Sequence, residues 1–174
     1  MRKSDSLTGF LYRQLEETNK WLLFSETKNV TLVALNVAIC SALSNFFEKH
    51  QVCVIIVLVG ILAASLISLF SFCPNVSSGE KVNKRKGDLS HGSINATFWG
   101  SIVEIGDAKS YLSFLEENYS LFRGNGECQA LCLDLAKEIV INSQIVAKKC
   151  EYFKLALGIE ILVFMVMLIM LIVA

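Results

Sequence analysis

Three long apolar segments constrain the fold of this chain more than any other feature. They are Val30–Phe47, Val52–Phe72 and Leu155–Ala174, and the last of them carries a single charge, Glu160. A helix of about 20 apolar residues crosses a bilayer, so each segment is long enough to span one. The alternative is a soluble four-helix bundle. A hydrophobic content of 53% argues against it.

Basic residues are unevenly distributed along the chain. Of sixteen Lys and Arg, five precede the first apolar segment, ten lie between the second and third, and one, Lys49, lies in the turn between the first two. Loops rich in Lys and Arg stay on the cytoplasmic side of a membrane. We therefore expect the N-terminus and Pro74–Lys154 to be cytoplasmic. No signal-peptide pattern precedes the first segment, which is expected to direct its own insertion.

The sequence predicts an all-α membrane protein in which three transmembrane helices continue into a cytoplasmic helical bundle. Residues 1–29 show apolar side chains at three- and four-residue spacing, which indicates a cytoplasmic amphipathic helix. A helix lying flat on the membrane surface is the alternative. We expect residues 30–72 to form a two-helix transmembrane hairpin, 73–154 a cytoplasmic loop and helices, and 155–174 the third transmembrane helix.

Two helices are predicted in the region after the second span. Asp107–Phe122 carries an apolar stripe at helical spacing, and a longer pattern runs without Pro from Glu127 into the third span. A helix of about 47 residues is roughly 70 Å long, which is more than twice the thickness of the bilayer core. The part outside the membrane, Cys128–Phe153, must pack against other helices to bury its apolar face.

Polar side chains recur at a similar depth in all three predicted spans. These residues are Asn36, Ser65, Ser68 and Glu160. Acids inside a membrane are costly and face a bundle interior or a water-filled cavity. Two interpretations stay open: these groups hold the bundle together, or they line a pathway. Because one three-helix chain cannot enclose a pore, the second interpretation requires a homo-oligomer.

A pair of charges, Glu26 and Lys28, marks the entry to the first span. Residues two apart on a helix do not face each other, so each charge needs another partner. The basic loop and Lys148–Lys149 are candidates for that role. Anchoring at the membrane interface is the alternative.

The sequence contains none of the common catalytic, phosphate-binding or metal-binding motifs. There is no Gly-rich phosphate loop, no Ser/His/Asp or Cys/His set and no metal-ligand spacing, so we expect neither an enzyme nor a cofactor. A loop rich in Ser, Gly and Lys is predicted over Asn75–Ser93. Its basic residues suit anionic lipid headgroups, and an anionic ligand is the alternative.

The order of several motifs resembles the Pycsar effector transmembrane domain family of bacterial anti-phage defence. The motifs are Phe24-Ser25-Glu26-Thr27-Lys28, a second span ending at Pro74, Phe98-Trp99-Gly100 and the Ala147–Tyr152 stretch before the last span. The resemblance implies a multi-pass protein of the bacterial inner membrane that responds to cyclic UMP or cyclic CMP made on infection. It implies a membrane-permeabilising homo-oligomer whose partners are lipid and this cyclic pyrimidine mononucleotide, with no DNA or RNA.

A cyclic mononucleotide needs cationic or backbone donors for its phosphate and a flat surface for its base. The candidates are Lys84, Arg85, Lys86 and Arg123 for the phosphate, with Trp99, Tyr111 or Tyr119 for stacking. Two other functions stay open. One is a membrane scaffold whose cytoplasmic stalk binds a protein partner, and the other is a constitutive holin-like channel.

Overall fold

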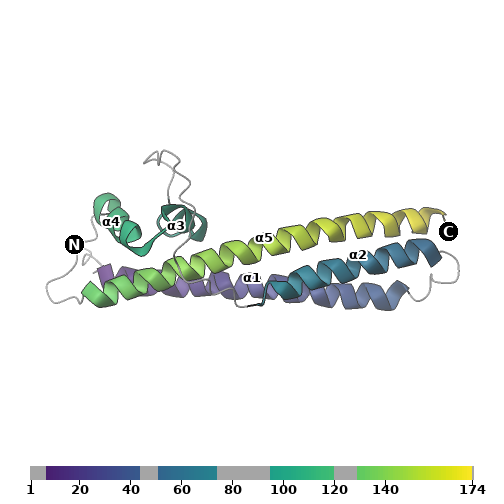
Figure 1. The fold of residues 1–174 in the computed structure, drawn as a ribbon, viewed down its shortest axis with the longest axis horizontal. Coiled ribbons are helices and arrows are strands. Elements are labelled where there is room, and N and C mark those ends of the chain that lie inside the picture. Colours follow the sequence, from purple (N-terminus) through teal and green to yellow (C-terminus); the bar gives the residue numbers. More distant parts are fainter. Residues whose placement is uncertain (1–6, 44–50, 74–94, 120–128, 174) are drawn as a thin grey trace, which may run out of the picture. The chain divides into compact units, whose positions relative to one another are not determined.

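A computed structural model describes residues 7–43, 51–73, 95–119 and 129–173 of the chain (Figure 1). The described part is helical, with no strand. Its elements are α1 (Leu7–Leu43), α2 (Gln51–Phe70), α3 (Trp99–Ile105), α4 (Ala108–Tyr119) and α5 (Gln129–Val173). Helices α1, α2 and α5 are long and apolar enough to cross a membrane. The prediction of an all-α membrane protein with three such helices is confirmed.

Helix α1 is continuous, as the lack of Pro and Gly after Phe10 predicts. Its buried residues alternate between three- and four-residue steps over most of their length, which is the repeat of coiled-coil packing. They are Leu7, Leu11, Gln14, Thr18, Ser25, Asn29, Leu32, Asn36, Ile39 and Leu43. Half of these side chains are polar, so the packed face of α1 is polar as well as apolar.

The chain divides into two compact units, and helices α1 and α5 contribute to both. Unit 1 contains Met1–Leu23 and Asn75–Ala147, and unit 2 contains Phe24–Pro74 and Lys148–Ala174. Each unit has its own buried core, and the two are described separately below.

The core of unit 1 combines the start of α1 with α3, α4 and the first part of α5. Its central side chains are Leu7, Leu11, Ile102, Tyr111, Leu115, Cys132, Leu135 and Ile139. Asp107 caps α4, because its Oδ1 accepts hydrogen bonds from the backbone N–H groups of Lys109 and Ser110, both at 3.0 Å. Gly106 joins α3 to α4 at φ 95°, a left-handed conformation that favours glycine.

In unit 2, helix α2 packs beside the later part of α1 and of α5 (Figure 1). The shared core consists of Ile39, Leu43, Val54, Val57, Ile61, Val163 and Met170. A Cβ atom built on Gly60 of α2 would lie 2.6 Å from Cγ2 of Val163 on α5, so the glycine permits a close approach of the two helices. The outward faces are rich in exposed Leu, Ile and Val, which suits contact with lipid.

Candidate functional site

An acid and an amide lie face to face inside the apolar part of unit 2. Glu160 of α5 and Asn36 of α1 are each only 1% exposed. With the Asn36 amide oriented to satisfy both of its ends, its nitrogen donates to Glu160 Oε1 at 2.7 Å and Oε2 at 2.9 Å. Its oxygen accepts a hydrogen bond from Ser65 Oγ of α2 at 2.9 Å. One polar side chain from each of the three helices thus joins a single cluster.

The Glu160 side chain points away from the lipid-facing surface. This orientation is expected, because a carboxyl group in contact with lipid has a high free-energy cost. A buried polar group is costly unless it is hydrogen-bonded, and a bilayer core offers no water in exchange. Ser68, the fourth residue of the expected polar layer, is buried, but its hydroxyl has no hydrogen-bond partner among the described residues. We call Asn36, Ser65 and Glu160 the intramembrane cluster.

A buried lysine forms a second polar cluster in unit 2. The Lys149 ammonium lies 3.2 Å from Glu26 Oε1 and donates to the Ser71 carbonyl oxygen at 3.1 Å. Ser71 directly follows α2, where the last carbonyls of the helix lack intrahelical partners. Lys149 therefore caps α2 and links it to α1 and α5. Of the predicted partners Lys148 and Lys149, the structure pairs Glu26 with Lys149, while Lys148 is exposed.

Lys28, the other charge at this entry, contacts aromatic rings. Its ammonium lies 4.7 Å from the ring centroid of Phe24 and 5.1 Å from that of Phe153. Cation–π contacts of this kind stabilise an ammonium group without the help of a carboxylate. Glu26 and Lys28 thus have separate partners, in agreement with their two-residue spacing.

The seven expected ligand residues fall into two groups. Lys84, Arg85, Lys86 and Arg123 lie outside the described residues. The three aromatic candidates belong to unit 1, where Trp99 is half-buried and stacks at a tilt on Phe98, with ring centroids 5.1 Å apart.

Tyr111 and Tyr119 hold a backbone segment. The Tyr111 hydroxyl donates to the Ala96 carbonyl at 2.9 Å, and the Ala96 N–H donates to the Tyr119 hydroxyl at 3.4 Å. Tyr111 is fully buried, and this burial raises its pKa well above the ordinary value, so the hydroxyl remains a donor. The expectation that Tyr111 stacks on a base is not met, because its ring lies inside the core.

Unit 1 also contains a cavity of about 480 Å³ that the sequence did not reveal. We call it the α1 cavity. Its lining residues are Phe10, Arg13, Gln14, Glu17 and Trp21 of α1, with Asn95, Thr97 and Phe98. The lining residues of α1 are spaced so that they occupy one stripe of the helix, and this spacing is visible in the sequence. Their partners lie more than 70 residues away in the chain, and no local pattern connects them.

The comparison with protein families gives one result. Residues 10–174 match the model of the Pycsar effector protein domain, PycTM. No curated protein and no solved structure matches the chain. The matched range contains the intramembrane cluster, the Lys149 cluster and the α1 cavity, and it agrees with the resemblance seen in the motifs. The chain therefore belongs to the Pycsar effector protein domain family.

Proposed function

We propose that this chain is an anti-phage effector of the bacterial inner membrane. In this account a cyclic pyrimidine mononucleotide activates it, and it then oligomerises and permeabilises the membrane without catalysis of its own. The observation that carries the proposal is the intramembrane cluster. A carboxyl group lies buried in one of the three membrane-length helices of this family member.

Within a single chain, the polar groups of the intramembrane cluster hydrogen-bond to one another. The partners of Glu160 come from its own bundle, and the three helices leave the side chain 1% exposed. We infer that this is the resting arrangement. In the active arrangement, neighbouring chains assemble so that Asn36, Ser65 and Glu160 face a shared water-filled path. The cost of polar groups in lipid favours such an assembly over separated helices.

The proposed orientation places the N-terminus and the chain between the second and third spans in the cytoplasm, where a cyclic nucleotide is made. It is supported by the fifteen-to-one distribution of Lys and Arg. Single cysteines placed at Ser90 and at Gln51 in a cysteine-free background test it with an impermeant thiol reagent. In intact spheroplasts only the Gln51→Cys variant should be labelled, and labelling of Ser90→Cys alone would reverse the orientation.

Expression with and without a cognate pyrimidine cyclase tests the function. We expect loss of membrane potential and uptake of an impermeant dye only when the active cyclase is present. The control is a cyclase inactivated in its catalytic site and expressed at the same level. Unconditional dye uptake would indicate a constitutive holin-like channel instead. No uptake under any condition would favour a scaffold that binds a protein partner.

A further inference from the structure

The α1 cavity has the size of a small-molecule site. Its volume of about 480 Å³ falls within the range of about 300–1,000 Å³ found for ligand pockets. We propose that it binds the cyclic mononucleotide, with Arg13 on the phosphate and Trp21 and Phe98 on the base. The identity of the ligand rests on the proposed function, while the location rests on the cavity itself.

One wall of the cavity is a single stripe of helix α1. Its residues follow each other at steps of three, one, three and four, and therefore point to one side of the helix. They are Phe10, Arg13, Gln14, Glu17 and Trp21. Gln14 is buried at the junction of the two walls, where its Nε2 donates to the Thr97 carbonyl at 3.0 Å.

The opposite wall, residues 95–98, is held in place before any ligand arrives. Tyr111 and Tyr119 bond the carbonyl and the N–H of Ala96, which is itself buried in the core. Asn95 Oδ1 accepts hydrogen bonds from the Thr97 N–H at 2.9 Å and the Thr97 hydroxyl at 2.7 Å. A preformed wall lowers the ordering cost of binding. The two tyrosines are thus positioning residues for this wall.

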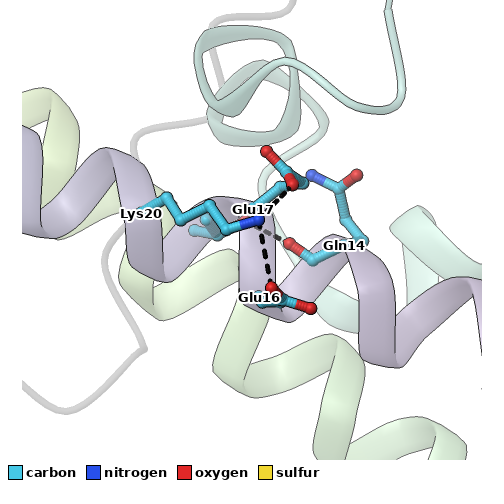
Figure 2. A network of polar contacts seen from close by, with 5 residues as sticks. Gln14, Glu16, Glu17 and Lys20 are labelled. Atoms are coloured by element: carbon cyan, nitrogen blue, oxygen red, sulfur yellow. Dashed lines mark hydrogen bonds and ion pairs between the residues drawn. The ribbon is translucent and has the colours of Figure 1, made fainter.

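The charges of the cavity suit a single negative charge. Arg13 is the one cation among the described residues that line it, and a guanidinium can bind two phosphate oxygens in a fork. Glu17 is paired with Lys20, whose ammonium lies 2.8 Å from Glu17 and 3.0 Å from Glu16 (Figure 2). A cyclic phosphodiester carries one charge and leaves a ribose hydroxyl that can donate to Glu17. A nucleoside di- or triphosphate would bring more charge than one arginine offsets.

Aromatic side chains supply the surface for the base. Trp21 is 41% exposed and Phe98 44% exposed, and they line the cavity from two different segments of the chain. Stacking on such a ring is tolerant of base identity, because every base has a π-face. The aromatic pair therefore contributes affinity for any base and does not distinguish one base from another.

Equilibrium dialysis of the purified chain in detergent micelles, with labelled cyclic UMP and cyclic CMP, tests the site. Arg13→Ala should raise the Kd about 10- to 100-fold, since it removes charge-assisted hydrogen bonds. Trp21→Ala should raise it about 5- to 100-fold through loss of stacking. Two matched controls lie outside the cavity in the same unit: Lys137→Ala, an exposed cation, and Tyr12→Ala, an exposed aromatic. Both should bind like the unaltered chain.

Fluorescence gives an independent readout, because the chain has only two tryptophans. Trp99→Phe leaves Trp21 as the sole emitter, and saturating nucleotide should quench it. If the unaltered chain binds neither nucleotide, the proposed activation by cyclic pyrimidines fails. If it binds one of them while Arg13→Ala and Trp21→Ala bind equally well and Trp21 is not quenched, the function stands and the location in the α1 cavity is overturned.

Discussion

The ammonium of Lys149 lies 3.2 Å from the carboxylate of Glu26, although the Lys149 side chain is only 9% exposed. The two partners are unequal, because the Glu26 side chain is 39% exposed and can turn to solvent. Lys149 has no such route, and its other hydrogen bond goes to the Ser71 carbonyl at the end of α2. The stability of this cluster of Glu26, Lys149 and Ser71 therefore depends on which partner is removed.

We predict that Glu26→Ala destabilises the chain more than Lys149→Met does. The first change leaves a buried charge unpaired, at a cost of about 1–3 kcal/mol. The second leaves a carboxylate that water can reach. The double variant should be about as stable as Lys149→Met alone, and denaturant unfolding in mild detergent measures all three. Additive losses in the double variant would show that the pair is not coupled.

The contact of Gly60 with Val163 gives a second prediction. Gly60→Ala should cost about 1–3 kcal/mol, because the new methyl group would overlap Cγ2 of Val163 at the approach of α2 to α5. Val163→Ala in the same chain should recover part of that loss. Gly158→Ala is the matched control, since its Cβ meets nothing within 4 Å, and it should be neutral or slightly stabilising. Equal effects of the two glycine substitutions would contradict the close approach.

We predict that the folded chain loses stability at alkaline pH because of the buried Tyr111. Burial raises the pKa of Tyr111 in the folded chain, whereas in the unfolded chain it titrates near its ordinary value of about 10. Above that pH the unfolded state loses a proton that the folded state keeps, so unfolding becomes easier as pH rises. Tyr111→Phe should remove this slope. It should also cost about 1–3 kcal/mol at neutral pH, since the Ala96 carbonyl loses its donor. Thermal unfolding followed at several pH values measures both effects.

The long helices could be predicted from sequence because their signal is local. Apolar composition and the absence of Pro identify α1, α2 and α5, and Asp107 marks the start of α4. The seven-residue helix α3 was not predicted, because it is too short for a periodic pattern to be visible.

The sites depend on contacts that local patterns do not contain. Asn36, Ser65 and Glu160 could be grouped from the sequence because they lie at a similar depth along helices that are long and apolar enough to cross the same bilayer. The α1 cavity, in contrast, needs residues 95–98 to meet α1, and the buried tyrosines that fix that segment appear in the sequence only as part of an apolar stripe. Lys149 illustrates the same limit, since a lysine in a polar run carries no sign that it will be buried.

Substitution of Glu160 separates its structural role from its proposed role in conduction. Glu160→Gln should keep the oligomeric state, because an amide can still exchange hydrogen bonds with Asn36. It should nevertheless change ion flux or cell killing at equal membrane expression, because it removes a charge from the path. Glu160→Leu should weaken the bundle by about 1–2 kcal/mol for each interhelical hydrogen bond lost. Unchanged flux and killing in Glu160→Gln would leave Glu160 with a structural role only.

Ion release from liposomes that contain only the purified chain tests the central claim most directly. The account predicts that the liposomes retain their contents until cyclic UMP or cyclic CMP is added, and that flux then rises together with oligomer formation. Glu160→Gln, reconstituted at the same density, should assemble on addition of the nucleotide and conduct differently. Intact liposomes at a nucleotide concentration that saturates the chain, or equal leakage with and without nucleotide, would contradict the account.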